Sequence, residues 1–306
     1  MARVLVTGAS GFAGPPIVAA LQEAGFTVRL ALRRAVSLGP DTETVPIGDL
    51  SGPVDWRQAL ADVDHVVHLA GLAHAGPGRD EKLYRRINTG ATLRLAEAAK
   101  AGGVGRFVFI SSIKALTGAS QGHFRDEDEP RPTDAYGRSK LAAEQGLAQL
   151  DLDWVALRPV LIYGPGVKAN MAALLKLAKL PIPLPLGGLA APRSLLAIDN
   201  LASAILFALS TDGPVRRSAI VSDPDPISVA DMLAQMRAGM GRRPGLLPVP
   251  SAILDRAAGL LGQGEAYRKL AGGLVAQPDT LLRSGWQPVL SVREGLRQLG
   301  ASVRGA

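Results

Sequence analysis

Tyr136 and Lys140 stand four residues apart at the start of a helical pattern, in the segment Asp134-Ala-Tyr-Gly-Arg-Ser-Lys140. Residues separated by four positions share one face of a helix, so this phenol and this ammonium would point the same way. A free tyrosine titrates near pH ~10, and a neighbouring ammonium stabilises the phenolate and lowers the pKa of the phenol. The pair is therefore a candidate proton shuttle for acid–base catalysis. The alternative interpretation is a solvated helix face.

The N-terminal stretch has the pattern of a strand, a glycine loop and a helix. Arg3–Thr7 is a β-rich run, Gly8, Gly11 and Gly14 follow it, and an apolar-periodic segment continues to Ala24. Glycines at this spacing allow a tight turn and let backbone amides approach a pyrophosphate at the N-terminus of the helix. The stretch predicts a dinucleotide-binding loop, and the alternative is a glycine-rich turn without a ligand.

The second predicted strand, Thr27–Leu32, ends at Arg33 and Arg34. An Asp or Glu near this position would hydrogen-bond the adenosine ribose of NAD, and none is present. Arginines at this place can pair with the 2′-phosphate of NADP. The sequence therefore favours NADP over NAD, unless both arginines are only solvated loop residues.

Strands and helices continue to alternate, which predicts an α/β fold with a doubly wound parallel sheet. Such sheets bind ligands beyond the carboxyl ends of their strands, and Ser112 follows directly after one predicted strand. The further predicted strands are Thr44–Asp49, His65–Ala70, Arg106–Ser111 and Trp154–Arg158, and the predicted helices are Trp56–Ala61, Arg79–Ala101 and the helix that carries Tyr136.

The character of the chain changes after Gly166. Leu180–Gly188 is rich in proline, Arg193–Leu209 has the pattern of an amphipathic helix preceded by a strand, and Ser218–Ser222 is one more strand. We predict a Rossmann dinucleotide-binding domain over residues 1–165 and a smaller, interwoven C-terminal substrate-binding region over 166–306. Residues 193–222 are expected to return to the first domain.

Composition narrows the classes of partner. The net charge is +7, but the basic residues are scattered and only 4% of residues are aromatic, so no nucleic-acid partner is expected and an anionic small molecule fits better. The absence of cysteine excludes disulfides and thiolate metal sites, and no metal site is predicted. A strand pattern begins within the first residues, and no apolar run reaches about 18 residues. We therefore expect a soluble cytoplasmic protein with no membrane partner.

A series of motifs runs along most of the chain: Thr7-Gly8-x-x-Gly11-Phe-x-Gly14, Gly48-Asp49-Leu50, His68-Leu-Ala-Gly71, Asn88, Ser111-Ser112, Tyr136-x-x-x-Lys140, Arg158-Pro159, Tyr163-Gly-Pro-Gly166 and Leu282-x-x-x-Gly285-Trp-x-Pro288. In this order they resemble the extended short-chain dehydrogenase/reductase family, in its branch of nucleotide-sugar epimerases and dehydratases. Several independent motifs in the family's order are far more specific than any one of them.

The resemblance implies a role for each motif. Tyr136 would be the catalytic acid and base, Lys140 would hold the nicotinamide ribose and lower the pKa of Tyr136, and Ser112 would hydrogen-bond the reacting sugar oxygen. His68 is interpreted as a satisfied strand histidine and left out of the catalytic set. The cofactor-binding residues implied are Gly8, Gly11, Phe12, Ala13, Gly14, Arg33, Asp49, Leu50, Leu69, Ala70, Gly71, Asn88 and Lys140.

Departures from the family pattern narrow the reaction. Dehydratases of this family carry an acidic pair directly after the Ser or Thr, whereas Ile113 and Lys114 follow Ser112, which argues against a dehydratase. The segments Ser111–Gly118, Gly164–Asn170 and Arg193-Ser194 resemble bacterial polysaccharide-pathway members that act on UDP-linked N-acetylhexosamines. The substrate-binding candidates are therefore Lys114, Lys168, Asn170 and Arg193, although Arg193 has the alternative of only bracing the following helix.

The leading hypothesis is an NAD(P)-dependent oxidoreductase or 4-epimerase that acts at carbon 4 of a UDP-hexose or UDP-N-acetylhexosamine. An NADPH-dependent reductase of a UDP-4-keto-hexosamine fits the same residues. Further alternatives are a reductase of a non-nucleotide carbonyl compound and a non-catalytic NADP sensor. The cofactor is NAD or NADP, with Arg33 favouring NADP. By analogy with the family, we expect a homodimer formed through the Arg79–Ala101 and Thr133–Leu150 helices.

Overall fold

A parallel sheet of seven strands organises the computed structural model, which describes residues 1–34, 42–73, 80–260 and 262–303. The strand order is β3-β2-β1-β4-β5-β7-β11, and each neighbouring pair is parallel. This arrangement confirms the predicted doubly wound α/β fold. The strands are β1 (Arg3–Thr7), β2 (Thr27–Leu32), β3 (Glu43–Pro46), β4 (His65–His68), β5 (Arg106–Ile110), β7 (Trp154–Pro159) and β11 (Arg217–Val221).

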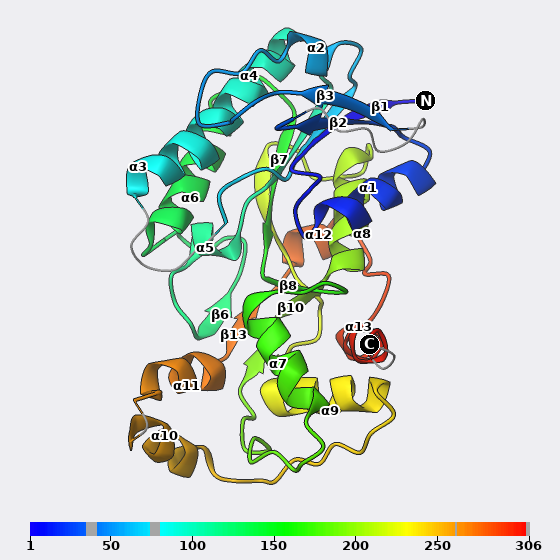
Figure 1. Cartoon of the computed structure of the whole chain (residues 1–306). Helices are drawn as coiled ribbons and strands as arrows, with labels where there is room; N and C mark the ends of the chain where they lie inside the picture. Colours follow the sequence, from blue (N-terminus) through cyan, green and yellow to red (C-terminus); the bar gives the residue numbers. More distant parts are fainter. Residues whose placement is uncertain (35–41, 74–79, 261, 304–306) are drawn as a thin grey trace.

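Helices cover both faces of the sheet (Figure 1), which explains why its central strands are continuous apolar runs rather than alternating ones. Apolar side chains of α1 and α8 pack on one face, and those of α2, α4 and α6 pack on the other. The bounds of these helices are α1 (Gly14–Glu23), α2 (Arg57–Leu60), α4 (Thr92–Ala101), α6 (Ala135–Leu147) and α8 (Ile198–Leu209).

The predicted single helix over Arg79–Ala101 is interrupted. Residue 79 lies outside the described residues, and the segment consists of α3 (Glu81–Tyr84), the π-helical turn η1 (Arg85–Ala91) and α4. A π-helical turn inserts an extra residue into the helical ladder, and such turns are frequent at functional sites. Here the turn carries the fully buried Asn88.

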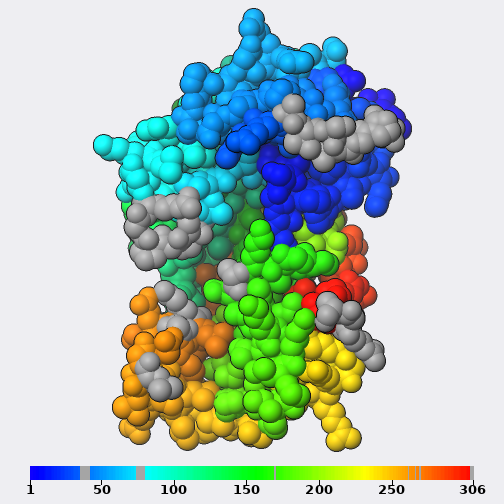
Figure 2. Space-filling model, in the orientation of Figure 1, coloured from blue at the N-terminus to red at the C-terminus, as the bar shows by residue number. Residues whose placement is uncertain are grey.

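Part of the C-terminal half forms a separate apolar core, which lies below the N-terminal segments in Figure 2. The apolar faces of α7 (Ala169–Lys179), α9 (Val229–Gly239) and α13 (Val292–Ala301) meet in this core. The remaining helices are α5 (Ile113–Leu116), α10 (Ser251–Leu260), α11 (Gly264–Ala271) and α12 (Asp279–Arg283). None of the helices in the described ranges is long and apolar enough to cross a lipid bilayer.

Three short strand pairs lie outside the large sheet. They pair β8 (Leu161–Tyr163) with β10 (Leu195–Ala197), β9 (Pro192–Arg193) with β12 (Ile227–Ser228), and β6 (Gly122–Phe124) with β13 (Leu274–Ala276). Two of them, β8 with β10 and β6 with β13, connect the two halves. The helix predicted to begin at Arg193 begins instead at Ile198, because Leu195–Ala197 forms a fully buried strand first. β11 then returns to the edge of the large sheet.

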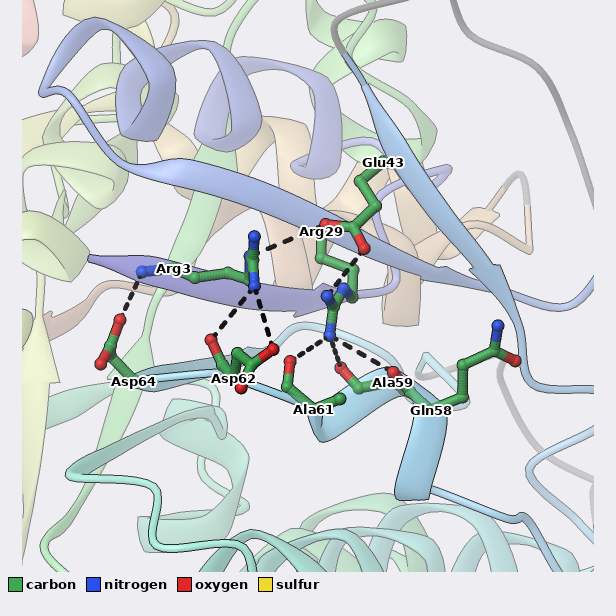
Figure 3. A network of polar contacts seen from close by, with 8 residues as sticks. All are labelled: Arg3, Arg29, Glu43, Gln58, Ala59, Ala61, Asp62 and Asp64. Atoms are coloured by element: carbon green, nitrogen blue, oxygen red, sulfur yellow. Dashed lines mark hydrogen bonds and ion pairs between the residues drawn. The ribbon is translucent and has the colours of Figure 1, made fainter. Parts of the chain in front are cut away.

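Arg29 fixes the opposite edge of this sheet. Its side chain is 5% exposed, and it donates hydrogen bonds to the carbonyls of Ala59 and Ala61 at 3.0 and 2.6 Å (Figure 3). The guanidinium also pairs with Glu43 of β3 at 2.7 Å. One buried cation thus joins β2, β3 and the end of α2. It lies near the amino ends of the strands, whereas ligands bind beyond the carboxyl ends.

Candidate active site

The strand order reverses at β1, which lies between β2 and β4. In doubly wound sheets this reversal opens a crevice at the carboxyl ends of the strands. Gly8 follows β1 with φ +77°, and a Cβ there would lie 2.5 Å from the Ala70 nitrogen. A Cβ on Gly14 would lie 2.0 Å from the Ala9 carbonyl oxygen. Both positions therefore require glycine for close backbone approach, which is what a dinucleotide pyrophosphate needs.

A groove of about 450 Å³ occupies this crevice. It is lined by eight of the predicted cofactor residues, namely Gly8, Gly11, Arg33, Asp49, Leu50, Leu69, Ala70 and Gly71. Gly14 begins α1, and Phe12 and Ala13 lie in the turn before it. The residues present thus fit a dinucleotide: small backbone positions at the helix N-terminus, an apolar floor, and charged side chains at one end.

Arg33 and Asp49 face each other across that end of the groove. The Arg33 Nε lies 3.9 Å from the Asp49 carboxylate, and both side chains are mostly exposed. The pKa of Asp49 is lowered chiefly by a hydrogen bond from the Ser51 backbone and less by Arg33. A loosely paired guanidinium at this place can exchange its partner for a phosphate.

The predicted catalytic residues meet at the ends of β5 and α6. Asp134 caps α6 by accepting a hydrogen bond from the Gly137 amide at 2.7 Å, which fixes the first turn that carries Tyr136. Tyr136 and Ser112 share a side-chain hydrogen bond. Together with Lys140 they line a cavity of about 230 Å³. The structure therefore brings together the three side chains that the sequence singled out.

Burial sets the proton affinities in this cavity. Lys140 is 4% exposed, its ammonium donates to the Ile110 carbonyl at 2.7 Å, and burial lowers its pKa to about 7. Burial raises the pKa of Tyr136, and the hydrogen bond with Ser112 opposes this effect. Desolvation is the largest effect on the pKa of this phenol, and the expectation that Lys140 lowers the pKa of Tyr136 stays a prediction.

The cofactor groove and the catalytic cavity are continuous. Leu69, Gly71 and Leu72, which follow β4, line both. A Cβ on Gly71 would lie 3.3 Å from the Lys140 ammonium, so this backbone passes directly beside Lys140. An extended ligand bound at the glycine loop can therefore reach Tyr136 through the same channel.

The sequence did not reveal a buried hydrogen-bond chain behind this channel. Thr92 donates its hydroxyl hydrogen to the Asn88 carbonyl, so its oxygen must accept from His68 Nε2, and His68 Nδ1 in turn accepts from Thr7. His68 is fully buried and its pKa falls to about 3, so the ring is neutral. The interpretation of His68 as a satisfied strand histidine agrees with these partners.

Asn88 belongs to this series of hydrogen bonds through its carbonyl, and its side chain fixes the wall of the channel. Its side-chain oxygen accepts from the Leu72 amide at 2.7 Å, and its amide group donates to the Leu72 carbonyl and to Ser139. Asn88 was predicted to bind the cofactor, but its polar atoms are engaged with the protein. The π-helical turn directs this amide inward, and no pattern in the sequence predicted the turn.

The predicted substrate residues do not line either cavity. Lys114 lies 4.0 Å from Asp134, and Lys168 and Asn170 are exposed at the start of α7. Arg193 donates to the carbonyls of Leu270 and Gly272. This agrees with the alternative that Arg193 has a bracing role. The element that it braces, however, is α11 and not the helix that follows it. Gly272 also lines a separate cavity of about 640 Å³.

Comparisons with known proteins agree with this geometry. The model of the NAD dependent epimerase/dehydratase family matches residues 4–220. The chain is 34% identical to UDP-glucose 4-epimerase of Vibrio cholerae, over 96% of this chain and 93% of that protein. A structure of MoeE5 in complex with UDP-glucose and NAD is 27% identical, with a TM-score of 0.72 over 99% of both chains. UDP-N-acetylglucosamine 4-epimerase from Bacillus cereus shares the fold, with a TM-score of 0.79, 19% identity and complete coverage of both chains.

The fold and the matched family define an NAD-dependent enzyme of the extended short-chain dehydrogenase/reductase type. The chain belongs to the NAD dependent epimerase/dehydratase family.

Proposed function

We propose that the protein interconverts the epimers of a UDP-hexose or UDP-N-acetylhexosamine at carbon 4. The observation that carries this proposal is the contact of Tyr136 with Ser112 beside Lys140, in a cavity continuous with the dinucleotide groove. The full-length similarity to UDP-glucose 4-epimerase supports the choice of carbon 4.

The residues divide the chemistry among them. When bound, NAD(P) supplies a nicotinamide that accepts and returns hydride. As the phenolate, Tyr136 takes the proton from the sugar hydroxyl, and as the resulting phenol it later returns this proton, while the Ser112 hydroxyl donates a hydrogen bond to the same sugar oxygen. Lys140 presents its ammonium one helical turn from Tyr136, where a positive charge favours the phenolate.

A deuterium-tracing experiment tests the reaction. UDP-glucose and UDP-N-acetylglucosamine labelled with deuterium at carbon 4 are incubated with the enzyme, and the epimeric product is analysed by NMR. An epimerase removes and returns the same hydride, so the label stays at carbon 4. Conversion that consumes NADPH and places its hydride on a 4-keto sugar would instead identify the reductase.

Identification of the cofactor released on denaturation provides a second test. Mass spectrometry of the supernatant should find NAD or NADP in near-stoichiometric amount if the cofactor is regenerated in place. We propose NADP as the preferred form, since Arg33 stands at the end of the groove and arginines, rather than an acidic residue, occupy the two positions directly after β2. Tighter binding of NAD than of NADP would contradict this preference.

We assign the UDP diphosphate to the side of the molecule where Arg193 lies. Arg193 contacts the end of α11, and Arg268 of the same helix lines the adjacent cavity with Tyr267. The Arg268 guanidinium can donate to a phosphate in a bidentate manner, and Arg193 fixes the backbone of Gly272, which lines the same cavity. Replacing either by alanine should raise the KM for the UDP-sugar without changing cofactor affinity.

A reductase of a non-nucleotide carbonyl compound is the second candidate. The observation in its favour is the apolar lining of the catalytic cavity, which includes Leu72, Val160, Leu161 and Ile162. Thermal unfolding with added UDP separates the two, because a ligand that binds only the folded state raises the Tm. A Tm that UDP leaves unchanged would favour the second candidate.

We also propose a homodimer that forms through α4 and α6. These two helices lie side by side on one face of the sheet in Figure 1. Light scattering at several protein concentrations should give twice the mass of one 31.8 kDa chain.

A further inference from the structure

A buried ion pair lies one helical turn beyond Lys140. Glu144 of α6 is 3% exposed, and Arg158 of β7 is 5% exposed. Arg158 donates through Nε at 3.1 Å and through Nη2 at 2.6 Å to the two oxygens of the Glu144 carboxylate. The hydroxyls of Ser111 and Ser218 also donate to this carboxylate. About four acceptor sites are available on a carboxylate, so its hydrogen-bonding capacity is filled.

A gain in folding stability is a weak explanation for the presence of such a buried ion pair. The desolvation of two buried charges costs about as much as their attraction returns, and apolar replacements of similar volume are often neutral or stabilising. The position of the pair is more informative than its strength. Lys140 and Glu144 are four residues apart on α6, so their side chains share one face of the helix.

The surroundings of Lys140 are otherwise poor in negative charge. Its ammonium donates to the Ile110 carbonyl and lies 4.6 Å from the centre of the Phe109 ring. Among the residues that the structure describes, the titratable and charged groups near it are Tyr136 and Glu144 of α6, the neutral His68 of β4, and Arg158 of β7 behind Glu144. Glu144 is the group whose negative charge raises the pKa of Lys140 against the effect of burial.

Glu144 also holds the end of β5. Ser111, which donates to it, follows the Ile110 carbonyl that accepts from Lys140 and precedes Ser112 of the catalytic cavity. The same carboxylate is therefore linked to the lysine by charge and to the serine by the backbone.

We propose that Glu144 is a positioning residue, which supplies the counter-charge of the Lys140 ammonium and fixes the end of β5 through Ser111. The proposal rests on the catalytic role of Lys140 proposed above. Glu144 touches neither cavity and acts through these two neighbours.

The test follows Lys140 itself, in the full-length protein without substrate or cofactor. Lysine labelled with ¹³C at the ε position is titrated by NMR, and the Lys140→Met variant identifies the signal. In Glu144→Gln the pKa of Lys140 should fall by about one unit or more, the low end of the effect of a nearby opposite charge. Where a substrate is turned over, kcat at pH 7 should fall at least about tenfold with little change in KM.

Two further variants separate charge from packing. Ser218→Ala removes a hydrogen bond from the same carboxylate but keeps its charge, so the pKa of Lys140 should not move. Glu144→Asp keeps the charge and should restore most of that pKa. If unpaired Arg158 prevents folding, Glu144→Gln combined with Arg158→Met removes both buried charges, and the pKa of Lys140 should again fall.

An unchanged pKa of Lys140 in the folded Glu144→Gln or double variant would overturn the proposal. An equal fall in Ser218→Ala would also overturn it, because loosened packing would then be the cause. These outcomes do not depend on turnover. A wild-type protein that epimerises no UDP-sugar refutes the proposed function and leaves the NMR comparison to decide the role of Glu144.

Discussion

Replacing Lys140 by methionine should abolish turnover and stabilise the fold. The side chain is 4% exposed, and burial lowers its pKa from 10.5 to about 7. The unfolded chain, where the lysine has its ordinary pKa, therefore binds a proton between pH 7 and 10.5 that the folded protein does not bind. Wild-type stability should rise with pH across this window and should be lowest below it. Methionine has a similar length and no charge to desolvate.

The magnitude follows from the two pKa values. Each pKa unit corresponds to about 1.4 kcal/mol, so the depressed pKa sets an upper limit of about 5 kcal/mol on the cost of the buried ammonium below pH 7. The hydrogen bond to Ile110 and the contact with the Phe109 ring are lost with the charge, which reduces the net gain. We expect Lys140→Met to be more stable than wild type by roughly 2–4 kcal/mol at pH 6.5.

The assay is urea unfolding of both proteins at pH 6.5 and at pH 9.5, in the absence of nucleotide. The difference in free energy of unfolding should shrink by most of its value at the higher pH, because the wild-type lysine is neutral in the folded state there. A Lys140→Met variant that is less stable than wild type, or a difference that does not change with pH, would refute the reasoning from burial.

Four other changes have definite outcomes. Tyr136→Phe should bind the cofactor normally and lose at least about 100-fold in kcat, and unchanged turnover in a spectrophotometric assay would remove the phenol from the mechanism. Gly8→Ala should destabilise the fold by more than about 1 kcal/mol and abolish cofactor binding, because its Cβ would meet the Ala70 nitrogen at 2.5 Å. Arg33→Ala should weaken NADP about tenfold or more in calorimetric titration while NAD is unaffected, whereas equal losses would indicate a general effect. His68→Gln should flatten the loss of stability between pH 6.5 and about 3, where the unfolded histidine takes up a proton that the buried ring refuses, and an unaltered acid unfolding curve would contradict this.

Residues close together in the sequence were the predictable part of the site. The glycine loop after β1 and the pair of Tyr136 with Lys140 depend on spacing within one turn or one helix, and local geometry determines both. The alternation of strands and helices likewise predicted the parallel sheet, because each repeated unit buries its own apolar run.

Contacts between distant segments could not be predicted in the same way. The attachment of Arg193 to α11 joins residues almost eighty positions apart, and only the folded chain shows that backbone carbonyls reach its guanidinium. Asp126 illustrates the same limit. Acidic side chains are mostly exposed in folded proteins, yet this carboxylate accepts from the amides of Ile220 and Thr280.

The extent to which Tyr136 is buried also could not be predicted from the sequence. The phenol and the ammonium were placed correctly, but the sign of the pKa change depends on how much water the surrounding elements exclude. At Tyr136, desolvation of the phenol outweighs the other effects on its pKa.

The position of β11 has a consequence for synthesis of the chain. β11 completes the sheet beside β7, but its residues 217–221 follow β7 by more than fifty positions. Until they leave the ribosome, β7 is an unpaired edge strand whose free amides and carbonyls can pair with another chain. A fragment cut at residue 165 would carry this edge permanently. The N-terminal half is therefore expected to aggregate when it is produced alone, even though it contains the glycine loop and the proposed catalytic residues Ser112, Tyr136 and Lys140.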